Sequence, residues 1–209
     1  MAAPEQAGEA SDPATIAYYD AEAPEYVASG NGGVSRWLAP FMEMLPSGAR
    51  VLELGCGGGR DAEAMVSAGF RVEPTDGSAA VAAKAQLRLG RPVRVMQFGE
   101  LTDVRAYDAV WANASLLHVP AEALPQILER VFEALKPGGL HFASYKAGGT
   151  PARDRVGRYF NHPDQAALRR AYSASGAWDV QSVVEYTGGG YENGRGPWIA
   201  ITVRRPSNA

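Results

Sequence analysis

Four glycines stand within residues 55–59, directly after a short apolar run at residues 49–54. The run is long enough for a buried parallel strand, and residues 61–68 beyond the glycines have a helical pattern with apolar side chains on one face. A glycine turn between a strand and a helix lets the backbone approach a ligand where a Cβ atom would clash, and it brings a helix N-terminus against that ligand. The chemistry expected here is the binding of a nucleotide-like cofactor.

Three glycine motifs compete for this stretch. A phosphate-binding P-loop is excluded because no lysine follows the glycines. The dinucleotide fingerprint G-x-G-x-x-G, started at Gly55, needs a glycine where Arg60 stands. The pattern E-x-G-x-G-x-G is satisfied by Glu53, Gly55, Gly57 and Gly59 without a mismatch. The remaining alternative is a glycine-rich loop that only turns the chain.

The pattern of Glu53 and the alternating glycines resembles the first motif of the class I S-adenosylmethionine-dependent methyltransferases. Two further elements of this resemblance are Asp76, about 20 residues beyond the turn, and the run Leu-Lys-Pro-Gly-Gly at residues 135–139 before an expected strand. The Gly-Arg-Asp step at residues 59–61 is similar to that of small-molecule enzymes of the type 11 and tellurite-resistance kind. The resemblance covers residues 51–204. It implies S-adenosylmethionine as the cofactor and S-adenosylhomocysteine as the product.

Asp76 is expected at the carboxyl end of the second strand, where a carboxylate can accept hydrogen bonds from both ribose hydroxyls. The alternative for Asp76 is a turn or helix-start residue, and Ser78 can cap the helix that follows. The resemblance further implies adenine contacts from Phe98 and Glu100. The residues expected to bind the cofactor are Tyr18, Tyr26, Glu53, Gly55, Cys56, Gly57, Gly59, Arg60, Asp76, Gly77, Ser78, Phe98, Glu100, Asn113 and Ala114.

The segment ahead of the first strand is rich in tyrosine. Residues 15–29 predict a short helix, a break at Pro24 and another helical turn. The resemblance implies that such a segment folds over the cofactor, while plain amphipathic packing is the alternative. The expected organisation is a disordered tail at residues 1–14, a helical lid or lead-in at 15–46 and a methyltransferase domain at 47–209.

The predicted fold class is α/β. Strands are expected at residues 49–54, 70–75, 93–98, 107–113 and 140–145, alternating with helices at 61–68, 79–89 and 121–135. A helix at 164–172 and strands at 178–186 and 198–204 follow, and the link between these two strands is too short for a crossover, so they pair antiparallel. The resemblance implies a Rossmann-like seven-stranded mixed sheet, with the last strand inserted antiparallel between the fifth and sixth and helices on both faces.

A long polar connection at residues 145–163 is expected on the ligand side of the sheet. Its cations predict a clamp on an anionic acceptor, or else a solvated loop. His118 follows the fourth strand and can be a general base near neutral pH, or a helix-start or packing histidine. The residues expected to bind the acceptor are Tyr19, His118, Lys146, Arg153, Arg158, Tyr159 and Tyr191.

Composition narrows the function classes. The 209-residue chain has a net charge of −3 and no basic patch of nucleic-acid-binding density or membrane-length apolar run. The start lacks a signal-peptide pattern, and the one cysteine fits a reducing cytoplasm. The three histidines are too far apart to predict a metal site.

These features predict a cytoplasmic methyltransferase that is monomeric or homodimeric. Its acceptor is expected to be a small molecule, either anionic or neutral, and catalysis is expected to occur by proximity without a metal. Two alternatives remain open at this point. One is a tRNA-modifying methyltransferase of the same fold, and the other is a non-catalytic, regulatory S-adenosylmethionine-binding domain.

Overall fold

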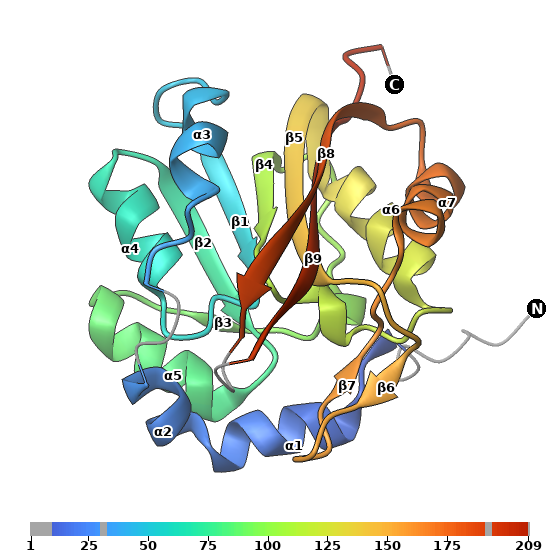
Figure 1. Ribbon diagram of the computed structural model, residues 1–209. Helices are drawn as coiled ribbons and strands as arrows, with labels where there is room; N and C mark the ends of the chain where they lie inside the picture. The colour runs from blue at the N-terminus through green and yellow to red at the C-terminus, as the bar shows by residue number, and fades with distance from the viewer. Residues whose placement is uncertain (1–9, 30–32, 191–193, 209) are drawn as a thin grey trace, which may run out of the picture.

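The computed structural model describes residues 10–29, 33–190 and 194–208. Its centre is a seven-stranded sheet in the order β3-β2-β1-β4-β5-β9-β8, in which β9 runs antiparallel to both of its neighbours and the pairs among the first five strands are parallel (Figure 1). The strands are β1 Arg50–Leu54, β2 Arg71–Asp76, β3 Arg94–Val95, β4 Tyr107–Ala112, β5 Leu135–Lys146, β8 Asp179–Gly189 and β9 Arg195–Arg204. The predicted fold class and the place of the last strand are confirmed.

Helices cover both faces of the sheet. The cluster of buried side chains on one face includes α6 and α7, and the cluster on the other includes α3 and α4. The four helices are α3 Leu38–Glu43, α4 Arg60–Ser67, α6 Leu124–Ala134 and α7 Gln165–Ser175. A fifth helix, α5 Ala79–Leu89, packs beside β2 and β3. The buried stripe of α6 contains Leu124, Ile127, Leu128 and Val131, as their helical spacing predicts.

The third strand is much shorter than predicted. Only Arg94–Val95 pairs with β2, and Phe98–Glu100 forms a short 3-10 helix instead of strand. The Glu100 carboxylate accepts a hydrogen bond from the Gln97 backbone N–H at 2.7 Å, which caps that turn. The prediction of a strand over residues 93–98 is therefore wrong at its carboxyl half.

The helix α6 ends at Ala134, directly before the run at residues 135–139, and β5 already begins at Leu135, five residues earlier than the predicted strand at 140–145. Leu135 pairs with Tyr107, while Leu140 pairs with Ala109, so the register shifts between them. Gly138 has a φ of 81°, which a residue with a Cβ rarely adopts. A bulge at Gly138 and Gly139 thus accommodates the residues of β5 that have no partner on β4, and the strand continues beyond them.

The long connection after β5 is organised rather than a plain loop. It contains a small hairpin of β6 Ala152–Arg153 and β7 Tyr159–Phe160. The turn between them is held by Asp154, which accepts hydrogen bonds from the backbone of Arg158 at 2.9 Å and from its guanidinium at 2.7 and 2.9 Å. This hairpin lies beside the N-terminal helices (Figure 1).

Two N-terminal helices, α1 Pro13–Ala21 and α2 Ala23–Ala28, lie across the carboxyl ends of the parallel strands (Figure 1). Asp12 caps α1 by accepting from the Thr15 backbone N–H at 2.8 Å, so this helix begins before the predicted residue 15. Pro24 stands in the first turn of α2, and the break falls at Glu22 instead. Most of the predicted tail, residues 1–9, lies outside the described residues.

Arg205 closes the far end of α6 from beyond β9. Its side chain is buried, and Nη1 donates to the carbonyl oxygens of Phe132 at 2.7 Å and Leu135 at 3.0 Å. A cation at a helix C-terminus satisfies carbonyl groups that have no partner within the helix and opposes the negative end of the helix dipole. The residue therefore joins the last strand to the start of β5.

Replacing Arg205 by methionine is expected to lower the free energy of unfolding by about 2–3 kcal/mol, because buried carbonyl groups lose a charged donor. Equilibrium denaturation in urea measures this. Arg170→Met, at an exposed position on α7, is the control and should change stability by less than about 0.5 kcal/mol. Equal small effects in the two variants would contradict the capping role.

Candidate active site

The glycine turn after β1 lies tightly against two other segments. Gly55 has a φ of 71°, and a Cβ atom there would lie 2.5 Å from the Cβ atom of Ser115. Gly57 has a φ of 53°, and a Cβ atom there would lie 3.2 Å from the Tyr26 hydroxyl. Both positions thus require glycine for the backbone angle and for the space.

Asp76, at the end of β2, is fixed next to this turn. Its carboxylate accepts hydrogen bonds from the backbone N–H groups of Gly57 at 3.0 Å and Ser78 at 2.9 Å. Burial nevertheless raises the pKa of Asp76 to about 6, because loss of hydration outweighs the two N–H donors that lower it. The carboxylate is charged at neutral pH and lies at the edge of a pocket.

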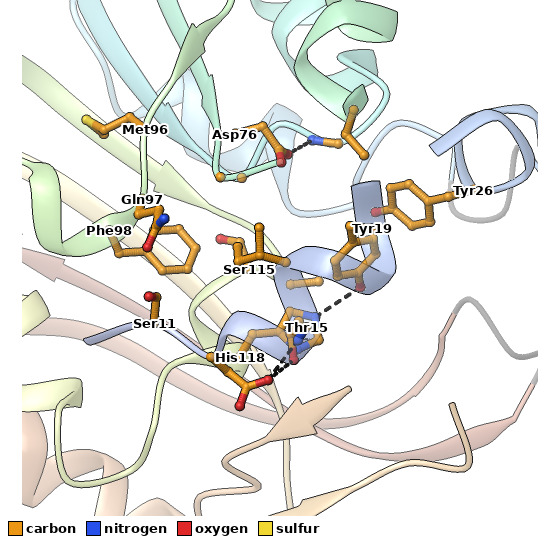
Figure 2. A pocket seen from close by; sticks show the side chains of 17 residues that line it. Ser11, Thr15, Tyr19, Tyr26, Asp76, Met96, Gln97, Phe98, Ser115 and His118 are labelled. Carbon is orange, nitrogen blue, oxygen red and sulfur yellow. Dashed lines mark hydrogen bonds between the residues drawn. The ribbon is translucent and has the colours of Figure 1, made fainter. Parts of the chain in front are cut away.

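That pocket, here called the inner pocket, is enclosed by α1, Asp76 and the segment at residues 96–98 (Figure 2). From α1 it receives Thr15, Ile16 and Tyr19. A Cβ atom at Gly77 would lie only 2.9 Å from the Ile16 side chain, so α1 packs closely over the end of β2. Figure 2 shows Phe98 and Gln97 in the same pocket as Asp76.

A second and larger cavity, the outer cavity, adjoins the inner pocket. Its volume is about 690 Å³, within the usual range for small-molecule sites. Six residues border both spaces: Tyr19, Tyr26, Gly55, Gly57, Ala114 and His118. The two spaces therefore adjoin each other at the glycine turn.

Most of the predicted cofactor residues border one of these two spaces. They are Tyr26, Glu53, Gly55, Cys56, Gly57, Arg60, Asp76, Gly77, Phe98, Asn113 and Ala114. The structure brings them together from β1, β2, β4, α2 and the turns that follow the strands.

Four predicted cofactor residues do not line either space. Glu100 caps its own short helix, and Ser78 caps α5 by accepting from Val81 N–H at 3.1 Å. Gly59 caps α4, where a Cβ atom would meet Leu89 at 3.2 Å. Tyr18 packs edge-on against Tyr19. A direct contact of these four with a cofactor stays a prediction.

The predicted acceptor residues divide in the same way. Tyr19, His118, Lys146 and Arg158 line the outer cavity. Arg153 instead pairs with Asp12 at 2.6 Å, and the Tyr159 hydroxyl accepts from the Ala121 N–H at 3.2 Å. Tyr191 lies outside the described residues.

Sequence reasoning missed several residues of the outer cavity. Its wall includes Arg36, Trp37 and Tyr186, together with Arg195 at the start of β9. No sequence motif singles out Arg36. The proximity of these residues arises only because the segment before α3 packs against β8.

Arg158 is a buried cation that several contacts fix in place. It is 2% exposed, forms an ion pair with Asp154 at 2.7 Å and donates to the Tyr19 hydroxyl at 3.2 Å. Its position thus depends on its own hairpin and on α1. These contacts favour an anchoring role for Arg158 over direct binding of an acceptor.

His118 and Tyr19 join α1 to the core. The His118 Nδ1 atom lies 2.6 Å from the carbonyl oxygen of Tyr159, so Nδ1 carries the proton, and Nε2 accepts from the Tyr19 hydroxyl at 3.0 Å. Burial lowers the pKa of His118 to about 4, and Arg158 and Lys146 act in the same direction. Burial also raises the pKa of Tyr19 to about 12. Both groups are therefore neutral at pH 7, and the role of His118 as a base stays a prediction.

The other histidines lie elsewhere. His141 is fully buried in β5, where its ring nitrogens bond the Val110 carbonyl at 3.1 Å and the Tyr172 hydroxyl at 3.0 Å. Over residues 10–29, 33–190 and 194–208, no three His, Cys, Asp or Glu side chains are grouped to hold a metal ion.

Within the same ranges, no helix is long and apolar enough to cross a membrane.

Comparison with known proteins identifies the class. A family model described as "Methyltransferase domain" matches residues 24–177. The chain belongs to this family, and its fold is that of the class I S-adenosylmethionine-dependent methyltransferases.

Individual relatives agree with this class. The chain is 38% identical over 105 residues to trans-aconitate 2-methyltransferase of Variovorax paradoxus, a match that covers 46% of this chain and 38% of that protein, so less than half of the relative is matched. A methyltransferase structure from Methanosarcina mazei has a TM-score of 0.73 at 15% identity, covering 80% of this chain and 97% of its own. The Burkholderia thailandensis 1,6-didemethyltoxoflavin-N1-methyltransferase with S-adenosylhomocysteine has a TM-score of 0.64 at 21% identity, covering 99% and 93%.

The residues present fit S-adenosylmethionine, the cofactor of this class. Asp76 offers a carboxylate for the ribose hydroxyls, and the glycine turn beside it presents backbone without Cβ atoms at Gly55 and Gly57. Glu53 is 3% exposed in the outer cavity, and its Oε2 atom has no hydrogen-bond partner within the described residues. A buried carboxyl oxygen of this kind suits the amino group of a methionine moiety.

Asp76 predicts a pH dependence of cofactor binding. Its pKa in the free protein is about 6, and hydroxyl donors favour the charged form, so affinity for S-adenosylhomocysteine should rise with pH through about 6 and level off near about pH 7. Asp76→Ala should lose this rise and weaken binding at pH 8 by about 1–3 kcal/mol. Calorimetry from pH 5 to 8 measures both effects, with the exposed-site variant Glu129→Gln as control. An unchanged pH profile in Asp76→Ala would refute the role of this carboxylate.

Tyr19→Phe keeps the ring and removes the hydrogen bonds to His118 and Arg158. Because two contacts that hold α1 are lost, dissociation of S-adenosylhomocysteine should be about 10-fold faster, which corresponds to about 1.4 kcal/mol. Stopped-flow displacement measures this rate. Ala17→Ser on the exposed face of α1 should leave it unchanged, and a similar rate in both variants would show that Tyr19 does not hold α1 over the ligand.

Proposed function

We propose that this chain transfers a methyl group from S-adenosylmethionine to a small molecule that carries an anionic group, with S-adenosylhomocysteine as the other product. The observation that carries the proposal is the outer cavity. It meets the inner pocket at the glycine turn, and its wall contains five basic side chains: Arg36, Arg60, Lys146, Arg158 and Arg195.

Basic side chains outnumber acids around this cavity. Among the described residues, the acids that border it are Glu53 and Asp61, and burial raises the pKa of both carboxyls. Arg36, Lys146 and Arg195 come from the segment before α3 and the ends of β5 and β9. A molecule in this cavity therefore meets a mainly basic and partly aromatic wall, which favours an anion with an apolar body.

The residues of the site support methyl transfer by proximity. When bound, S-adenosylmethionine supplies the electrophilic methyl group. Asp76 and the glycine turn hold the cofactor, while α1 and the buried Phe160 limit the access of water to the junction of the two spaces. His118 is neutral, and both of its ring nitrogens form hydrogen bonds within the protein. The site therefore suits an acceptor whose attacking atom is already ionised, because such an acceptor transfers no proton to a base.

The comparisons are compatible with this acceptor class. The name of the Variovorax relative specifies trans-aconitate, a flat carboxylic acid. A carboxylate that accepts a methyl group on oxygen reacts in its ionised form. We therefore infer a carboxylate or an acidic hydroxyl as the methylated group.

Three further features enter the proposal. The N-terminal segment acts as a lid over the cofactor, since α1 borders the inner pocket along its length. The one cysteine, Cys56, is buried and has no second cysteine in the sequence to pair with, which fits a reducing cytoplasm. A tRNA-modifying role is disfavoured by the net charge of −3.

Calorimetry with S-adenosylhomocysteine tests the cofactor half of the proposal, and a metabolite screen with methyl-labelled S-adenosylmethionine tests the acceptor half. We expect label in a small organic acid. Label in tRNA would support the first alternative. Cofactor binding without turnover across the screen would support a regulatory binding domain.

Lys146→Met tests the charge of the outer cavity. The Lys146 ammonium lies 3.9 Å from the centre of the Phe160 ring, so methionine keeps the packing and removes the charge. We expect kcat/KM for the anionic acceptor to fall about 10- to 100-fold, since a charge-assisted contact is worth about 1.5–3 kcal/mol, while affinity for S-adenosylhomocysteine stays constant. Lys84→Met on the exposed face of α5 is the control. Equal losses for the acceptor and the cofactor would refute a role specific to the acceptor.

A further inference from the structure

Arg36 lies in no motif, yet its backbone is firmly placed. The preceding Ser35 N–H donates to the Asp61 carboxylate at 2.8 Å, and the Trp37 N–H donates to the Ser35 hydroxyl at 3.3 Å. Asp61 is itself buried and accepts from the Trp111 indole N–H at 2.9 Å. The carboxylate in the first turn of α4 thus fixes the segment that carries Arg36 to the centre of the sheet.

The Arg36 side chain rests on aromatic rings instead of on an acid. Its guanidinium carbon lies 4.4 Å from the centre of the Tyr186 ring and 5.3 Å from that of Trp37. In the part of the chain that the structure describes, no carboxylate forms an ion pair with it. The guanidinium also hydrogen-bonds the Tyr186 side chain, and its other N–H groups remain for a ligand, with a planar fork that matches a carboxylate.

The wall next to Arg36 is aromatic. The rings of Tyr186 on β8 and Trp198 on β9 have their centres 6.2 Å apart and an angle of 25° between the planes. A Cβ atom at Gly188 would lie 2.7 Å from the Trp198 ring, so this glycine lets β8 lie closely along the indole. Both residues border the outer cavity, and aromatic side chains favour ligands with a ring or another unsaturated group, which can pack against them.

We propose that Arg36, with the wall of Tyr186 and Trp198, is a subsite for a carboxylate on a planar, unsaturated or aromatic acceptor. This inference rests on the proposed function and adds the chemical class of the acceptor. Arg36 enters the outer cavity from the segment before α3 and from the side of β8 and β9, whereas Tyr19 and His118 stand at the junction with the inner pocket. In this proposal the anchored carboxylate is a different group from the one that is methylated, so the acceptor carries two functional groups.

The alternative is that Arg36 only packs against Tyr186 and stabilises the segment before α3. The two roles differ in what they affect. A packing role changes the melting temperature and leaves ligand selectivity alone, while a subsite changes the preference for acids over matched neutral molecules.

The test compares acids with their own amides on protein saturated with S-adenosylhomocysteine. The probes are trans-cinnamate, 4-hydroxybenzoate and trans-aconitate, each with its neutral amide, titrated by calorimetry. In the wild-type protein at least one acid should bind 10-fold or more tightly than its amide. Arg36→Gln should remove that preference, and Arg36→Lys should retain part of it because the charge remains without the planar fork.

Arg88→Gln is the matched control, since this arginine pairs with Glu63 on the outside of α4 and α5. It should keep the full preference for acids, and all variants should bind S-adenosylhomocysteine within twofold of the wild type. An undiminished acid preference in Arg36→Gln, or a loss of thermal stability without a loss of preference, would overturn the subsite. No acid preference in the wild-type protein would overturn it as well. Failure of S-adenosylhomocysteine to bind the wild type would instead contradict the proposed function.

Discussion

The hydrogen bond from the Gly57 N–H to the Asp76 carboxylate is the contact on which the site depends. It ties the turn after β1 to the end of β2, at the edge of the sheet where ligands of such folds bind. Because the same carboxylate accepts from Ser78, it also sets the start of α5. Burial removes water from the Asp76 carboxylate and disfavours its charged form, which raises its pKa. Ionisable residues with a shifted pKa are typical of binding sites.

The helix α1 converts this edge into an enclosed site. Its ends are held by different parts of the molecule. Asp20 at one end accepts from the Ser78 hydroxyl at 2.6 Å, and Asp12 at the other pairs with Arg153 of the hairpin at 2.6 Å. Between them, Tyr19 contacts His118 and Arg158. The helix therefore touches the cofactor side and the acceptor side at once, and an opening of either side must disturb it.

The same contacts explain why the cations near the site differ in role. Arg153 and Arg158 are both paired with acids, one across to α1 and one within the hairpin. Arg36 instead lies over aromatic rings that border the outer cavity. A cation on a ring retains more of its field than a cation neutralised by a carboxylate, so Arg36 is better suited to attract an anionic acceptor than Arg153 or Arg158.

Much of the fold was determined by the sequence alone, because it depends on local patterns. Apolar periodicity placed β1, β2, β4 and α6 to within a few residues, and the spacing of Glu53, the glycines and Asp76 singled out residues that come together around the two adjoining spaces. Only the tertiary structure decided which acids and cations face the ligand. Glu100 caps its own short helix, and Arg153 pairs with Asp12, which is 141 positions away along the chain. Arg36 entered the outer cavity because Asp61 holds its segment and Tyr186 lies beside it. Such pairings join residues that are distant in sequence, and no local periodicity encodes them.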